Sequence, residues 1–181
     1  NNDELAEKLA LLRSHGITRD ADKMTKEAEG GWYYQQVDLG LNYRMTELQA
    51  ALGVSQLKRI DEFVAARHRL AKRYDAQLAG VPLTLPHQAE SGYSALHLYP
   101  IMVNDSAKRK PLFDYLREKG IGVNVHYIPV HTQPYYQQLG HKVGDYPAAE
   151  EYYSRAISIP MYSTLSEDEQ DFVINAIREF F

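Results

Sequence analysis

The sequence predicts a mixed α/β protein in which a long helix leads into a small α+β domain. The first observation is the stretch from Thr46 to about Leu78, which lacks proline and spaces its apolar residues three to four apart for most of its length, as a helix does. The second is the alternation of β-rich and helical segments over residues 95–181. The third is an ordinary globular composition, with 44 % apolar and 24 % charged residues among 181.

The N-terminal segment predicts one short helix and an ordered loop. Leucines three and four apart from about Glu4 to Ser14 give one apolar face, with Asn2-Asp3 as the N-cap and Gly16 as the stop. Residues 17–42 lose this period and predict an ordered loop with a short strand. Because position 1 is an asparagine and a helix begins at once, we expect a piece of a longer polypeptide.

The long helix is the dominant predicted element. Thr46 is suited to cap its start, Glu47 places an acid in the first turn, and Gly80 ends it. At 1.5 Å per residue it would be about 50 Å long, which is too long for one small core. We therefore expect it to join two lobes.

The small domain follows a linker at 80–94 that contains Pro82, Pro86 and Gly92. Ser106 is the expected cap of its first helix, and Ser166 with Glu169 forms a capping-box pattern for its last. The predicted elements are a strand at 95–103, a helix at 106–119, a strand at 123–128, a loop at 129–147, a helix at 148–156, a strand at 157–159 and a helix from 166.

Composition excludes several classes of protein. The absence of cysteine excludes a disulfide scaffold, a zinc ribbon and a thiol nucleophile, and it favours a reducing compartment. A net charge of −4 argues against a general nucleic-acid binder, and no apolar run is long enough to span a bilayer. The 14 tyrosines suit clefts and interfaces, because each combines an apolar body with a polar tip.

The loop that enters the long helix is the first candidate site. The amides of a helix N-terminus favour an anion, Arg44 adds a planar charged group, and Asn42 adds amide donors. The alternative is that Asn42 fills a turn and Arg44 forms a structural ion pair. Spacing alone modestly favours this structural alternative.

The second candidate is the segment Val125–His131. Its two histidines are five apart, so a strand would direct them to opposite faces, and we expect no metal site. The segment either presents His126 and Tyr127 to a ligand or is a capped strand end with exposed histidines.

An ordered set of motifs along essentially the whole chain resembles the DegT/StrS family of sugar aminotransferases. Each motif is weak alone, but the set in this order is highly specific. Segments 33–45 and 126–136 look most like the branch that acts in pseudaminic acid biosynthesis. The motifs are Arg13-Ser14-His15-Gly16, Gly40-Leu41-Asn42-Tyr43-Arg44-Met45, Gln49-Ala50-Ala51-Leu52-Gly53, Gln56-Leu57, Val125-His126-Tyr127-Ile128-Pro129-Val130-His131, Gln133-Pro134, Ala149-Glu150 and Ser158-Ile159-Pro160.

The resemblance implies a fold type I transaminase that uses pyridoxal 5′-phosphate (PLP), with a short, largely antiparallel sheet in its small domain. It implies a cytoplasmic homodimer with active sites at the subunit interface and no nucleic-acid or membrane partner. The implied reaction moves the amino group of L-glutamate to the C4 keto group of a nucleotide-linked, UDP-type 4-keto-6-deoxy amino sugar, for cell-surface or flagellar glycans.

The resemblance also implies roles for five residues. The residue matching Asn42 reaches the cofactor phosphate of the partner subunit, and the one matching Arg44 lies near the diphosphate of the nucleotide sugar. Those matching His126, Tyr127 and Ile128 lie near the nucleotide sugar. This favours the functional interpretation of Asn42 and Arg44 over the structural one.

The family's Schiff-base lysine has no counterpart here, because none of the lysines of this chain lies in the matching context. We therefore expect that lysine to precede Asn1, no catalytic residue within these 181 positions, and no activity of the segment alone. The expected parts are 1–45 as the end of the large cofactor domain, 46–79 as the connecting helix and 80–181 as the small C-terminal domain.

Two other interpretations stay open. A binding or dimerisation module could keep the scaffold without the chemistry. A regulatory homologue could bind the cofactor without transamination, although it would need the remainder of the fold for most cofactor contacts.

Overall fold

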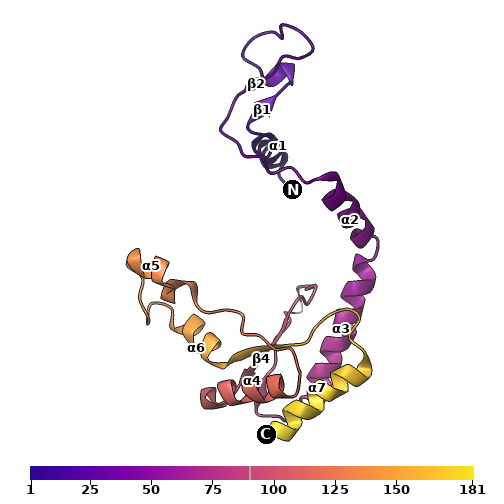
Figure 1. The fold of residues 1–181 in the computed structure, drawn as a ribbon, viewed down its shortest axis with the longest axis vertical. Helices are drawn as coiled ribbons and strands as arrows, with labels where there is room; N and C mark the ends of the chain where they lie inside the picture. Colours follow the sequence, from indigo (N-terminus) through magenta and orange to yellow (C-terminus); the bar gives the residue numbers. More distant parts are fainter. Residues whose placement is uncertain (90) are drawn as a thin grey trace. The chain divides into compact units, whose positions relative to one another are not determined.

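The computed structural model of this protein describes residues 1–89 and 91–181. It divides into two compact units, Asn1–Lys58 and Arg59–Phe181 (Figure 1). Among the described residues, no helix is both long and apolar enough to cross a bilayer.

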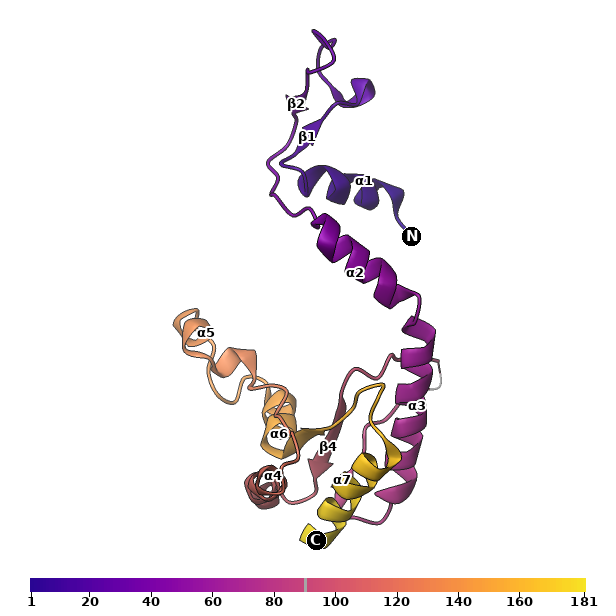
Figure 2. The same ribbon diagram turned by 45° about the vertical axis from the view of Figure 1, so that its right-hand side comes forward.

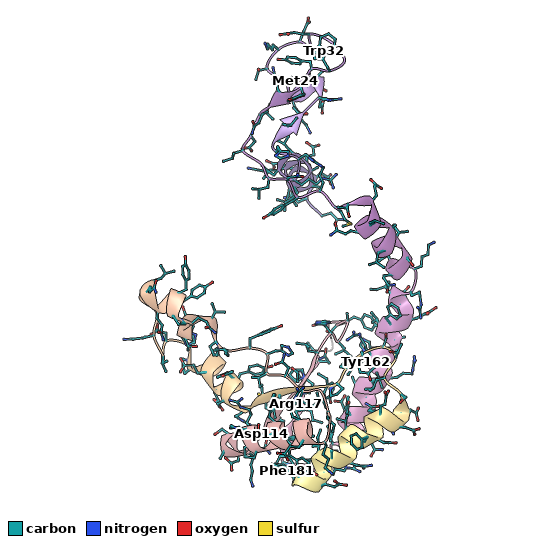
Figure 3. All side chains as sticks on the ribbon, viewed as in Figure 1. Met24, Trp32, Asp114, Arg117, Tyr162 and Phe181 are labelled. Carbon is teal, nitrogen blue, oxygen red and sulfur yellow. The ribbon has the colours of Figure 1, made fainter. Side chains whose placement is uncertain are left out.

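The first unit contains two helices and a two-stranded sheet. Helix α1 covers Asp3–Leu12, and the Asn2 side chain accepts a hydrogen bond from Leu5 N at 3.0 Å, which confirms the predicted cap. Strands β1 (Ile17–Thr18) and β2 (Gln35–Gln36) pair antiparallel and flank the 3₁₀ turn η1 (Ala21–Lys23). The loop before β2 carries Trp32 (Figure 3), whose side chain is exposed. Helix α2 covers Glu47–Leu57.

The predicted long helix is helical over nearly all its length but is divided into two. Helix α2 ends at Leu57 and α3 covers Ile60–Gln77, with Lys58 and Arg59 between them. Arg59 leaves the helical region of backbone conformation (φ −114°, ψ 6°), and its guanidinium lies over the Phe63 ring, 4.8 Å from the centroid. No proline or glycine marks the division, and the apolar spacing continues through it, so periodicity alone predicts an unbroken helix.

The second unit is an α+β domain built on a three-stranded sheet. The sheet order is β3-β4-β5, antiparallel throughout, with Leu83 opposite Val103 and Ile101 opposite Ile157. This confirms the expected short antiparallel sheet. The further elements are β3 (Leu83–Thr84), β4 (Tyr99–Val103), η2 (Ser106–Lys108), α4 (Arg109–Glu118), η3 (Val130–Thr132), α5 (Pro134–Gln138), α6 (Pro147–Arg155), β5 (Ala156–Ile159) and α7 (Glu167–Phe180).

The hydrophobic core lies between this sheet and helices α3, α4 and α7. Strand β4 alternates buried and half-buried residues, so it has one face on the core, and all four residues of β5 are buried. Helix α7 lies alongside α3 and packs on α4 (Figures 1 and 2). The core side chains include Leu70, Tyr74, Tyr99, Ile101, Leu112, Leu116, Ile157, Ile174 and Ile177.

The structure corrects three local predictions. Segment 123–128 is not a strand, because it makes one isolated bridge, between Asn124 and Ser158, and then leaves the sheet edge. The helix predicted from Ser106 begins with the turn η2, and Asp105 rather than Ser106 is the cap, accepting from Ala107 N at 2.9 Å. The predicted linker contains strand β3. Its remaining residues are irregular, and Glu90 lies outside the described residues.

Candidate functional site

Two glycines place the segment that carries Asn42. A Cβ on Gly40 would lie 2.3 Å from Gly16 N, and one on Gly16 would lie 1.9 Å from Asp38 O, so both positions exclude a side chain. Gly16 also has a positive φ of 69°. This close approach lets the chain after Gly40 run against the end of α1.

Backbone hydrogen bonds then fix the register of that segment. Leu41 N donates to Leu12 O at 2.7 Å, and Tyr43 N donates to Arg13 O at 2.9 Å. Asn42 forms an isolated antiparallel bridge with Ser14. The Arg13-Ser14-His15-Gly16 motif is therefore a helix terminus that holds the Asn42 segment, which explains why the two motifs occur together.

Asn42 and Arg44 are both exposed, and neither side chain has a hydrogen-bond or ion-pair partner among the described residues. Within residues 1–89 and 91–181, the structure thus shows no ion pair of the kind that the structural interpretation of Arg44 required. Two amide donors and a planar guanidinium, two residues apart on a fixed segment, are a donor set that fits a phosphate group.

The N-terminus of α2 contributes less to this site than expected. Thr46 accepts from Gln49 N at 3.3 Å, and the Gln49 side chain accepts from Thr46 N at 2.9 Å, which completes a capping box. Glu47 adds a negative charge in the first turn. An anion here would therefore be held mainly by the side chains of Asn42 and Arg44.

The second candidate segment lies in the other unit, against strand β5. Asn124 exchanges backbone hydrogen bonds with Ser158, and the His126 ring contacts Ser158 Oγ through Nδ1 at 2.8 Å. Asn124 Nδ2 lies 3.2 Å from His126 Nε2, so Nε2 accepts from the amide and Nδ1 carries the hydrogen. Tyr127 and Ile128 are exposed, at 71 % and 50 %.

The loop ends at a half-buried pair that sequence reasoning missed. His131 is 7 % exposed, and its Nε2 lies 2.7 Å from Glu150 Oε1 in the first turn of α6. Gly144 N donates to the same oxygen, also at 2.7 Å. The hydrogen bonds from His131 and Gly144 hold the pKa of the Glu150 carboxyl below its usual value. No periodicity links residues 19 apart, so the only signals were the two family motifs that contain His131 and Glu150.

The five predicted site residues fall in two groups. Asn42 and Arg44 belong to the first unit, and His126, Tyr127 and Ile128 belong to the second. Among the described residues, no cluster of three His, Asp or Glu side chains could hold a metal ion. One pocket, of about 540 Å³, lies between the Gly120–Gly122 turn and the start of α7, and its lining includes Phe172 but none of the five residues.

Comparison with known proteins places this arrangement in a family. Residues 1–178 match the DegT/DnrJ/EryC1/StrS aminotransferase family. The chain belongs to that family. The match covers both units and all five predicted site residues, and its solved members share this fold, which is that of PLP-dependent aminotransferases.

Two relatives have names that refer to polysaccharide biosynthesis or to an amino sugar. The spore coat polysaccharide biosynthesis protein SpsC of Bacillus subtilis is 38 % identical over 99 % of this chain and 47 % of its own length. The UDP-4-amino-4,6-dideoxy-N-acetyl-beta-L-altrosamine transaminase of Campylobacter jejuni is 32 % identical over 96 % of this chain and 44 % of its own. The chain thus spans about half the length of these curated relatives.

A solved structure agrees closely with this one. It is the PMP form of the putative sugar aminotransferase Spr1654 from Streptococcus pneumoniae, with a TM-score of 0.87 and 30 % identity. The match covers 99 % of this chain and 45 % of that protein.

Proposed function

We propose that this chain is the C-terminal part of a PLP-dependent aminotransferase of nucleotide-linked sugars. The complete enzyme moves the amino group of L-glutamate to the C4 keto group of a UDP-linked 4-keto-6-deoxy amino sugar, giving a 4-amino sugar and 2-oxoglutarate. The product belongs to pseudaminic-acid-type glycan biosynthesis. The observation that carries this proposal is the family match over residues 1–178.

Within this proposal the chain divides as its sequence suggests. Residues 1–45 complete the cofactor domain, 46–79 connect, and 80–181 form the small domain. The catalytic lysine belongs to the remainder of the protein. The exposed leucines of α2, Leu48 at 85 % and Leu52 at 63 %, support a further protein surface over this helix. We assign that surface to the remainder of the fold and to a second copy in a cytoplasmic homodimer.

Asn42 is the residue of this chain that we assign to the cofactor, and the assignment is to the PLP of the partner subunit. Its amide donors are exposed, and its backbone is fixed by the bridge to Ser14. The neutral amide can donate hydrogen bonds to a phosphate oxygen, and the phosphate charge is then left for cationic groups to balance. The bound cofactor supplies the electron sink that makes transfer of an amino group possible.

Arg44 is the residue that we assign to the diphosphate of the nucleotide sugar. Its guanidinium is exposed and lacks an ion-pair partner within the described part of the chain. A phosphate would give it the charge-assisted, two-point hydrogen bonding that arginine geometry favours. This binds and orients the sugar without touching the reacting carbon.

His126, Tyr127 and Ile128 are the residues that we assign to the nucleotide sugar. The His126 ring is held through Ser158, so its orientation is set before a ligand binds. Tyr127 and Ile128 present an aromatic and an aliphatic surface. These suit the faces of a base or a deoxy sugar, which are less polar than those of an ordinary sugar.

Steady-state kinetics of the full-length protein test this assignment. Arg44→Ala should raise the Michaelis constant for the UDP-linked keto sugar by about tenfold or more, because a charge-assisted bond worth about 1.5–3 kcal/mol is lost. The Michaelis constant for glutamate should stay within about twofold of the wild-type value. Loss of an exposed arginine that does not bind the amino donor has a small effect on that step. Arg44→Lys should fall between wild type and Arg44→Ala.

Two outcomes would contradict parts of the proposal. Equal increases in both Michaelis constants would remove Arg44 from the diphosphate site. A wild-type protein that binds nucleotide sugar but transfers no amino group would favour the non-catalytic binding module instead.

A further inference from the structure

The loop that carries His126, Tyr127 and Ile128 is held at two points. At one end, the backbone of Asn124 and the ring of His126 bond to Ser158 of β5. At the other, His131 bonds to Glu150 of α6. Tyr127 and Ile128 lie between these two points, and neither side chain makes a hydrogen bond among the described residues.

The second point joins three segments at one carboxylate oxygen. Glu150 Oε1 receives the His131 ring and Gly144 N, each at 2.7 Å, and Glu150 itself stands in the first turn of α6. The short turn η3 links His131 to the residues that precede it in the chain. Thr132 N and Oγ1 both donate to Pro129 O, at 3.0 and 2.7 Å. Pro129 directly follows Ile128, so fixing Pro129 also fixes the C-terminal end of segment 126–128.

The histidine of the pair is buried, and the glutamate is half-buried. His131 is 7 % exposed, and the Tyr146 ring meets it edge-on with 4.8 Å between centroids. His131 also lines a cavity of about 350 Å³, together with Tyr136, His141 and Tyr146. A hydrogen bond to a charged group in such surroundings is stronger than an exposed one, and its loss leaves a buried imidazole without a partner.

We propose that His131 and Glu150 are positioning residues that hold the 126–128 segment in its ligand-binding arrangement. They do not contact the ligand themselves. This inference rests on the proposed function, because it takes 126–128 to be the nucleotide-sugar segment. It adds a role for two residues that no motif spacing assigned.

The test combines hydrogen exchange with kinetics on the full-length protein. In Glu150→Ala the amides of residues 130–133 and of Gly144 should exchange about tenfold faster, and the Michaelis constant for the nucleotide sugar should rise about tenfold. The amides of Asn124 and Ser158, at the other point, should keep their rates. The Michaelis constant for glutamate should also be unchanged.

Two further variants make the result specific. Glu150→Gln keeps an acceptor of the same shape, so it should keep most of the nucleotide-sugar binding. Its increases in exchange rate and in Michaelis constant should be smaller than those of Glu150→Ala. Glu151→Ala is the matched control, because Glu151 is the next residue on α6 and makes only an exposed pair with Arg155. It should leave exchange and kinetics at their wild-type values. Glu150→Gln also serves if Glu150→Ala does not fold.

Faster exchange together with a raised Michaelis constant for the nucleotide sugar would support the proposal. Unchanged exchange would overturn it, and so would faster exchange with unchanged binding of the nucleotide sugar. If the wild-type protein transfers no amino group, the proposed function fails instead. The exchange rates then decide by themselves whether the pair holds the loop.

Discussion

Single residues place both candidate segments, and they do so by different physics. Gly16 and Gly40 act by lacking a side chain, which lets two backbones touch and brings Asn42 against the end of α1. His131 and Glu150 act by a partly buried charge-assisted hydrogen bond. An added side chain at either glycine should therefore disturb the first segment. Removal of a polar side chain from the His131–Glu150 pair should disturb the second.

The glycine contact gives a test at this scale. In the full-length protein, Gly40→Ala should lower the free energy of unfolding by at least about 2 kcal/mol, because the new Cβ would lie 2.3 Å from Gly16 N. It should also weaken retention of the cofactor, since Asn42 follows two residues later. Calorimetry and the content of bound cofactor measure both effects.

Gly122→Ala is the control for this prediction. Gly122 is exposed in the second unit, its φ is not in the left-handed region, and a Cβ there has no described neighbour within 4 Å beyond the adjoining residues, so alanine should change the free energy of unfolding by less than about 0.5 kcal/mol. Equal destabilisation by both substitutions would show that the Gly16–Gly40 contact has no special role.

Residues that act locally were predictable, whereas residues that act across the chain were not. Asn2, Thr46 and Ser166 were identified as caps, because a cap bonds within three positions of itself. The partner of His131 is 19 positions away, and Gly16 and Gly40 are 24 apart, so no local pattern joins them. For Asn42 and Arg44, spacing alone modestly favoured a structural role, and only the family motif favoured a ligand-binding one.

At the scale of elements, the errors arose where the rest of the structure overrode a local pattern. Segment 123–128 has β-branched residues, but it makes one backbone bridge, at Asn124, and beyond it the contact with Ser158 is made by the His126 side chain. Strand β3 lies between two prolines, which suggested a linker. Its two residues pair with the end of β4, where an edge strand tolerates nearby proline.

Helix α7 provides the test at this scale. Ser166 accepts from Glu169 N at 3.2 Å, and Glu169 accepts from Ser166 N at 2.8 Å. Ser166→Ala should lower the stability of α7 by about 1 kcal/mol, which hydrogen exchange of its first-turn amides would measure. Thr164→Ala, in the preceding exposed turn, should have little effect. A larger effect at Thr164 than at Ser166 would contradict the capping role.

The same cap should weaken in acid. The backbone hydrogen bond from Ser166, with its hydroxyl, lowers the pKa of Glu169 below the usual 4.5. A lowered native-state pKa means that the stabilisation is complete above the usual value and is lost as the pH falls through the lowered one. The stability difference between wild type and Glu169→Gln should therefore shrink below about pH 4.

At the scale of the whole molecule, the two units differ in how they are stabilised. Every buried apolar side chain of the described residues lies between Ala66 and Ile177, in the second unit. The first unit leaves Leu39, Leu48 and Leu57 exposed and buries only Gly16. Residues 1–58 therefore lack a core of their own and need a further protein surface. This agrees with the finding that the whole chain spans about half of its relatives' length.

Under the proposed function, the complete protein is a nucleotide-sugar aminotransferase. The most direct measurement follows the isotope-labelled amino nitrogen of L-glutamate after incubation with full-length protein, PLP and a UDP-linked 4-keto-6-deoxy amino sugar. We predict that the label appears in the nucleotide sugar, in amounts equal to the 2-oxoglutarate formed. Label that stays in glutamate while the nucleotide sugar binds would contradict the claim and identify a binding protein on the same scaffold.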